Sequence, residues 1–111
     1  MKKDGYVYLL MESTDEELYK IGVTRGIIEN RIRSLQTGNG SEISLCRYYK
    51  TKHPFLIEKK LHEHHMSQRT SGEWYKLDAD DVLNFEKECE SLEKMIDSLK
   101  DNPFVSKKID I

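Results

Sequence analysis

Cysteine is scarce in this chain of 111 residues, which contains only Cys46 and Cys89. So few and so distant cysteines exclude a disulfide scaffold and a cysteine-rich zinc cluster, and we expect two reduced, buried thiols. Long apolar runs are also lacking: no stretch approaches the 18 residues that indicate a membrane-spanning helix, and no signal-peptide pattern opens the sequence. We therefore expect a soluble, cytoplasmic protein without a membrane partner.

A strong positive charge is lacking as well, because 18 lysines and arginines are outnumbered by 20 aspartates and glutamates. The charges are unevenly distributed. Residues 1–77 contain 13 basic and 10 acidic side chains, whereas residues 78–111 contain 5 and 10. The first part is therefore mildly basic and the second acidic. A protein with so little positive charge would bind nucleic acid tightly only through specific contacts or through an extra module.

The residues that are present suffice for one modest core, since 37% of the chain is hydrophobic. Runs rich in β-branched and aromatic residues predict strands at 5–11, 17–23 and 42–51, the first two joined as an antiparallel hairpin. A short extended piece is predicted at 73–77, after a loop at 69–72. The expected fold class is α+β, with a small three-stranded antiparallel sheet flanked by helices.

Apolar residues at helical spacing predict helices at 27–36, 55–67 and 80–99. Pro54 immediately precedes the second of them, a position that suits its fixed φ. The third helix is acidic and is an addition to the sheet and its flanking helices.

This division predicts a domain over 1–78, a C-terminal acidic amphipathic helix over 79–100 and a loosely ordered tail over 101–111. The apolar residues of the helix alternate spacings of three and four, as in a short coiled coil. They are Val82, Phe85, Cys89, Leu92, Ile96 and Leu99. We favour packing of this seam on the sheet of the same chain; a homodimer or a protein partner is the alternative.

Two short strings lie in the predicted hairpin, Tyr6-Val7-Tyr8 and Lys20-Ile21-Gly22. Because side chains alternate between the faces of a strand, the hairpin should bring Tyr8 and Lys20 close together on one face. Gly22 would permit a close approach of the backbone near the end of its strand.

Two more polar side chains follow on predicted helices. Arg31 lies beside the apolar stripe of the first helix, and Glu58 lies on the second. An aromatic hydroxyl, a lysine, an arginine and a carboxylate together are suited to metal-assisted cleavage of a phosphodiester, whose oxygens gain negative charge in the transition state. One carboxylate ligand is typical of magnesium, which retains several waters.

The order and spacing of these four side chains resemble the GIY-YIG endonuclease superfamily. The likeness is greatest to its compact phage- and virus-borne branch, whose second motif reads Tyr-Lys-Ile-Gly, as residues 19–22 do here. Leu61-His62 and Gly72-Glu73-Trp74 add to the likeness, which covers about residues 4–78.

This resemblance implies a metal-dependent DNA endonuclease that hydrolyses phosphodiester bonds with one divalent ion, Mg²⁺ or Mn²⁺, in an infected cell. Tyr8 would help to activate the attacking water, and Arg31 would stabilise charge on the phosphate. Glu58 would hold the metal. Lys20 would hold the phosphate when charged or accept a hydrogen bond when neutral.

Five further residues are candidates for substrate contacts or for supporting the site: Tyr19, His62, Arg69, Trp74 and Asn84. Asn84 is the candidate counterpart of an asparagine that often completes the active site of the family. Trp74 and Tyr75 could stack on bases, but core filling is the favoured alternative for Trp74.

The cluster His62-Glu63-His64-His65 invites comparison with zinc sites. The metalloprotease motif His-Glu-x-x-His is missed by one residue, because Met66 occupies its last position. His62 and His65 have suitable helical spacing, but the sequence shows no second ligand group at a suitable distance. The sequence therefore favours a helix histidine near the site over a zinc ligand.

Two departures from the family pattern keep another function open. Tyr6 stands where the first motif has glycine, and Lys20 stands where the second has tyrosine. A catalytically inactive nucleic-acid-binding module on the same fold, or a protein-interaction module whose acidic helix docks a partner, is therefore the alternative to an enzyme.

Overall fold

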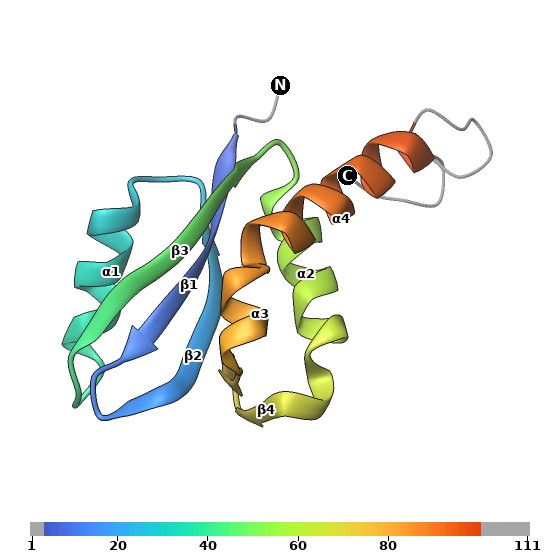
Figure 1. Cartoon of the computed structure of the whole chain (residues 1–111). Coiled ribbons are helices and arrows are strands. Elements are labelled where there is room, and N and C mark those ends of the chain that lie inside the picture. Colours follow the sequence, from blue (N-terminus) through green and yellow to red (C-terminus); the bar gives the residue numbers. More distant parts are fainter. Residues whose placement is uncertain (1–3, 101–111) are drawn as a thin grey trace.

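In the described part of the chain, the sheet has five antiparallel strands in the order β3-β1-β2-β5-β4. Figure 1 shows β1 between β3 and β2. This computed structural model describes residues 4–100, apart from the side chains at positions 15 and 16; the predicted tail at 101–111 lies outside the described residues. The strands are β1 (Gly5–Glu12), β2 (Asp15–Thr24), β3 (Ile43–Thr51), β4 (Arg69–Ser71) and β5 (Trp74–Lys76). The α+β class is confirmed.

The predicted number of three strands is wrong. Residues 69–71, which were expected in a loop, form β4, and the extended piece at 73–77 is β5, paired with both β4 and β2. Gly72 makes the turn between them with φ of 54°, a conformation that glycine adopts without strain. The three residues of β4 are too few for alternation to reveal a strand.

The β1–β2 hairpin places Tyr8 and Lys20 on one face of the sheet, as the sequence predicts. Tyr8 lies opposite Gly22 and Leu10 opposite Lys20, so Tyr8, Lys20 and Gly22 share one face of the sheet. The register shifts at Met11, where the hairpin closes on its turn.

Among residues 4–100, four α-helices accompany the sheet: α1 (Ile28–Thr37), α2 (Pro54–His64), α3 (Ala79–Leu83) and α4 (Phe85–Lys100). Helix α2 begins at Pro54, as expected, but ends three residues earlier than the predicted 55–67. There the backbone tightens into a short 3₁₀ helix, η1 (Met66–Gln68).

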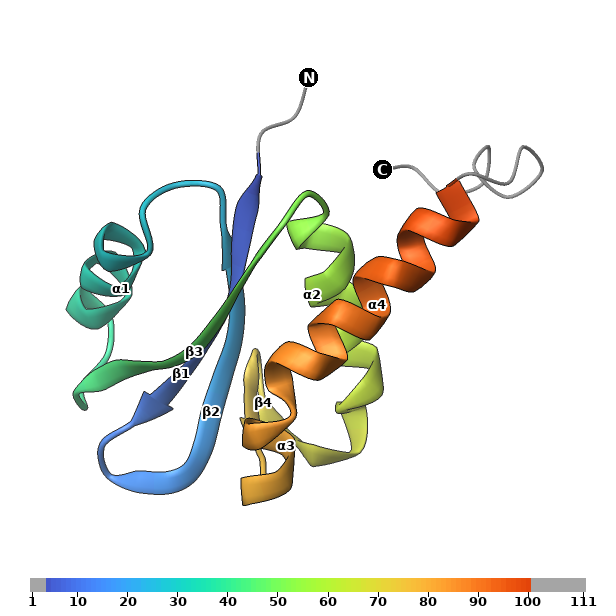
Figure 2. The same cartoon turned by 45° about the horizontal axis from the view of Figure 1, so that its top comes forward.

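The single helix predicted at 80–99 is divided at Asn84 into α3 and α4, which run in different directions (Figures 1 and 2). Helix α3 begins with a capping box in which Asp78 and Asp81 bond each other's backbone N–H groups. The apolar spacing from Val82 to Phe85 continues across the break, and this continuity concealed it.

Helix α1 covers one face of the sheet, and the other three α-helices cover the opposite face (Figures 1 and 2). On the α1 face, Tyr8 and Leu10 are buried against Ile32 and Leu35 of the helix. On the opposite face lies the larger cluster: Val7, Leu9, Tyr19, Ile21, Ile57, Leu61, Tyr75, Leu77, Phe85, Cys89 and Ile96.

The apolar seam of the acidic helix packs on its own domain, as favoured from the sequence. Phe85, Cys89 and Ile96 are buried in the larger cluster, and Val82 and Leu92 pack against it. A homodimer or protein partner through this helix stays a prediction. Within residues 4–100, no helix combines the length and the apolarity needed to cross a bilayer.

The packing of Tyr8 on Gly22 gives a first prediction. A Cβ atom at position 22 would lie 2.4–2.5 Å from atoms of the Tyr8 ring and hydroxyl, and Tyr8 is only 1% exposed, so the ring cannot move aside freely. Gly22→Ala should therefore lower the free energy of unfolding by about 1–3 kcal/mol in denaturant titrations. Gly40→Ala is the control, because its Cβ would meet no atom within 4 Å. Equal stabilities of the two variants would contradict this packing.

Candidate active site

Tyr8 and Arg31 meet on the α1 face of the sheet. Strand β1 supplies Tyr8, whose ring lies over the backbone of Gly22. The first turns of α1 supply Arg31, whose Nε donates a hydrogen bond to the Tyr8 hydroxyl at 3.3 Å. This bond uses Nε, so the terminal nitrogens of the guanidinium can bind another group.

Lys20 lies next to these residues on β2. Its Nζ is 3.3 Å from Oε2 of Glu73 and 5.5 Å from the centre of the Trp74 ring. The Lys20 side chain is only 16% exposed, whereas that of Glu73 is 48% exposed. The ion pair is thus half in solvent and contributes little stability, but together with the aromatic ring it orients the ammonium.

Glu58 reaches the site from α2 on the other face. Burial, and secondly the neighbouring carboxylate of Glu73, raise the pKa of Glu58 to about 7, against the opposing effect of Lys20 and Arg31. A carboxyl that changes its charge near neutral pH is typical of functional sites.

His62 follows Glu58 by one helical turn. Its Nε2 is 3.7 Å from Oε2 of Glu58, and its Nδ1 is hydrogen-bonded to the hydroxyl of Tyr75. Burial lowers the pKa of His62, which favours the neutral ring at neutral pH.

Side chains from both faces of the sheet can approach one another at this site because β5 is short. Strand β5 pairs with β2 only from Leu18 to Lys20, and the N–H of Ile21 bonds the carbonyl of Glu73 where the pairing ends. Strand β2 continues to Thr24, beyond β5. Side chains from α2 can therefore approach those of the α1 face around the end of β5.

Electrostatic effects connect the four predicted side chains. Burial raises the pKa of Tyr8, the hydrogen bond from Arg31 lowers it, and the charges of Glu73 and Glu58 raise it further. Lys20 and Arg31 both act on the pKa of Glu58. The structure thus brings together residues from β1, β2, α1 and α2.

Three neighbouring side chains of the site can hold a divalent ion. Glu58, His62 and Glu73 each offer a ligand atom, and the three atoms lie within 4.8 Å of one another. Two carboxylates suit Mg²⁺ or Mn²⁺, and the ring nitrogen adds a donor that Mn²⁺ accepts more readily. The raised pKa of Glu58 fits this assignment, since a cation would relieve the repulsion between the carboxylates.

The remaining predicted residues differ in their relation to the site. Arg69 and His62 line one surface pocket together with Glu58, and Trp74 lies beside Lys20. Tyr19 is buried in the larger core cluster, on the face opposite to Lys20. Asn84 is an exposed residue at the break between α3 and α4.

The sequence did not single out Glu73, which contacts Lys20, and it suggested base stacking for Tyr75 but not its contact with His62. Both flank Trp74 at the start of β5, and their contacts depend on the pairing of β5 with β2. The string Gly72-Glu73-Trp74 was the sequence signal for Glu73.

One comparison with known proteins finds a family whose model matches most of the chain. The family model described as the T5orf172 domain matches residues 5–94, which include every element from β1 to most of α4. This is a phage-associated domain found in nuclease contexts. No curated protein and no solved structure is significantly similar to the chain.

The titration of Glu58 gives a second prediction, for the metal-free protein in chelator. Its pKa in the folded protein, about 7, lies above the ordinary value of 4.5 expected for the unfolded chain. The stability contributed by the protonated carboxyl is therefore complete below about pH 4.5 and is lost as the pH rises through about 7. Glu58→Gln should stabilise the protein at pH 8, by about 2–3 kcal/mol, and change little at pH 4.5.

Thermal melts of both proteins at the two pH values measure this difference. Glu90→Gln is the matched control, because Glu90 is 58% exposed on α4. An advantage of Glu58→Gln that is equal at both pH values would contradict the raised pKa.

Proposed function

The chain belongs to the T5orf172 domain family, and on that premise we propose that it is a metal-dependent DNA endonuclease of the GIY-YIG type. Its substrate would be the phosphodiester backbone of DNA. The observation that supports this most directly is the convergence of Tyr8, Lys20, Arg31 and Glu58 from four separate elements.

Arg31 and Lys20, the two cationic side chains of the site, would bind the phosphate. Arg31 would offer the terminal nitrogens of its guanidinium to the non-bridging oxygens, which gain charge in the transition state. The ion pair with Glu73 supports the charged, phosphate-holding role of Lys20 over a role as a neutral acceptor.

Glu58 would hold the divalent ion, with His62 and Glu73 as further donors. When bound, Mg²⁺ or Mn²⁺ would supply Lewis-acid stabilisation of charge on a phosphate oxygen. The pKa of Glu58, about 7, implies that the carboxyl binds a cation best as the pH rises above neutrality.

Tyr8 would position the attacking water and receive its proton. The water oxygen forms a bond to phosphorus while one ester oxygen leaves, and that leaving oxygen takes up a proton from solvent. Burial raises the pKa of Tyr8, so the phenol is neutral at rest and would first have to release its own proton to solvent before the phenolate could accept the proton of the water. Its hydrogen bond with Arg31 opposes that shift, so a proton-accepting role for Tyr8 depends on Arg31.

The decisive test compares cleavage by wild type and Glu58→Ala. Supercoiled plasmid and branched DNA are incubated with each protein, with and without Mg²⁺ or Mn²⁺. Wild type should nick DNA only with metal, and Glu58→Ala should fall to the background without metal because the carboxylate that holds the ion is gone. Glu90→Ala, on the exposed side of α4, should cleave like wild type.

Two outcomes would contradict the proposal. Unchanged nicking by Glu58→Ala would rule out the metal assignment. Metal-independent DNA binding by wild type without cleavage would favour the inactive nucleic-acid-binding module instead.

The role of Tyr8 gives a further prediction. Tyr8→Phe keeps the buried ring and removes the hydroxyl, so the rate of cleavage should fall about 10²–10⁴-fold with little change in melting temperature. The control is Tyr48→Phe, at an exposed tyrosine directly opposite Tyr8 on β3. Lys20→Met should lose less than Tyr8→Phe. Normal cleavage by Tyr8→Phe, combined with an inactive Lys20→Met, would instead assign proton transfer to the lysine.

A further inference from the structure

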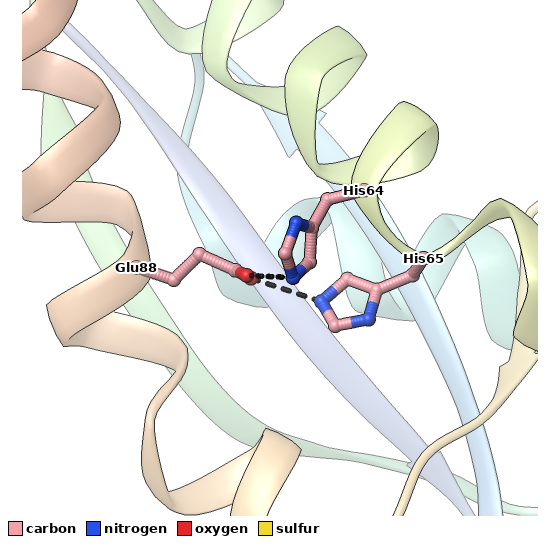
Figure 3. A group of neighbouring side chains, drawn as sticks. All are labelled: His64, His65 and Glu88. Carbon is pink, nitrogen blue, oxygen red and sulfur yellow. Dashed lines mark hydrogen bonds and ion pairs between the residues drawn. The ribbon is translucent and has the colours of Figure 1, made fainter.

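A second cluster of ligating side chains connects the C-terminal end of α2 to α4. His64 and His65 point their rings toward the carboxylate of Glu88 (Figure 3). Nε2 of His64 is 2.9 Å from one oxygen of Glu88, and Nε2 of His65 is 2.9 Å from the other. The ligand atoms of the three residues lie within 4.8 Å of one another.

The donors have the chemistry of a zinc site. Two imidazole nitrogens and one glutamate carboxylate form a set that binds Zn²⁺ with one position left for water. The side chains of His65 and Glu88 are 6% and 22% exposed, so they form an inner wall. The side chain of His64 is 64% exposed, which leaves an open side for ion entry and for water.

The hydrogen bonds around His65 orient its ring for a metal. Nε2 of Gln68 donates to the Asp81 carboxylate at 2.7 Å and to the carbonyl of Lys76 at 3.2 Å, which sets the orientation of the Gln68 amide. Its Oε1 then accepts from Nδ1 of His65 at 2.8 Å. The proton is therefore held on Nδ1, and Nε2 is the atom that faces Glu88.

This arrangement leaves two ways to satisfy Nε2 of His65. Either it carries a second proton, which makes the ring a cation beside Glu88, or its lone pair binds a metal that Glu88 also binds. An outer hydrogen bond that fixes the ring of a ligating histidine, as Gln68 provides here, is a common feature of metal sites.

We propose that His64, His65 and Glu88 bind one Zn²⁺ ion, which joins the end of α2 to α4. The sequence did not favour zinc because no second ligand group was apparent. That group is Glu88, which packing places beside the histidines from another helix, 23 positions beyond His65. The ligands are different from those of the candidate active site, so the proposal does not depend on the endonuclease activity.

Cobalt is the probe for this site, since tetrahedral Co²⁺ absorbs visible light far more strongly than the aquo ion. The full chain is freed of metal, titrated with Co²⁺ and then with Zn²⁺. Wild type should develop this absorption at one equivalent and lose it when Zn²⁺ displaces the cobalt. His64→Ala and Glu88→Gln should not develop it, and Glu90→Gln should behave like wild type.

Two further variants locate the ion. His62→Ala removes a donor of the candidate active site and should leave the cobalt spectrum unchanged. Gln68→Ala removes only the partner of Nδ1 and should weaken Zn²⁺ binding about 10–100-fold. Thermal melts give an independent readout, because Zn²⁺ should raise the melting temperature of wild type but not of His64→Ala.

Each contrary result overturns the proposal. Absence of the absorption in wild type would show that the cluster is a protonated hydrogen-bond network without metal. An unchanged spectrum in His64→Ala, or its loss in His62→Ala alone, would place the ion elsewhere. His64→Ala should fold normally because its side chain is largely exposed, and far-ultraviolet circular dichroism checks this.

Discussion

The contact between the Tyr8 ring and the backbone of Gly22 is the constraint on which the site depends. Only a residue without Cβ lets the ring lie this close to β2, since the nearest ring atom is 2.4 Å from where that carbon would be. The ring is held on the α1 face, and its hydroxyl reaches Arg31. One strand of the core thereby determines the position of the Tyr8 hydroxyl.

The ionised carboxylate of Glu58 in this site lowers the stability of the folded protein. Glu58 is half-buried and its pKa is raised to about 7, while the nearest carboxylate, Glu73, is engaged by Lys20. A protein selected for stability alone would replace Glu58 with an uncharged residue. Such a cost is typical of sites where a carboxylate must bind a cation or exchange a proton.

Sequence patterns predicted the parts of the fold that extend over many residues. The strands near 5–11, 17–23 and 42–51 and the start of α2 at Pro54 are close to their predicted places, because alternation and helical spacing need several residues to become visible. The three-residue strand β4, the pairing of β5 with its neighbours and the division of the last helix lack such a signal. The four central side chains could be selected from order and chemistry, whereas the role of Glu73 follows from strand pairing that no local pattern reports.

Helix α2 carries ligating residues for both proposed metal sites, so its rigidity determines whether they act on each other. Ile57, next to Glu58, and Leu61, between Glu58 and the histidines at the end of the helix, are fully buried and fix the helix on the sheet. Close-packed protein interiors resist the small displacement that an ion bridging His64 to α4 could impose on the helix. The helix therefore holds Glu58 in place whether or not the second cluster binds zinc, and the two sites are separable by mutation.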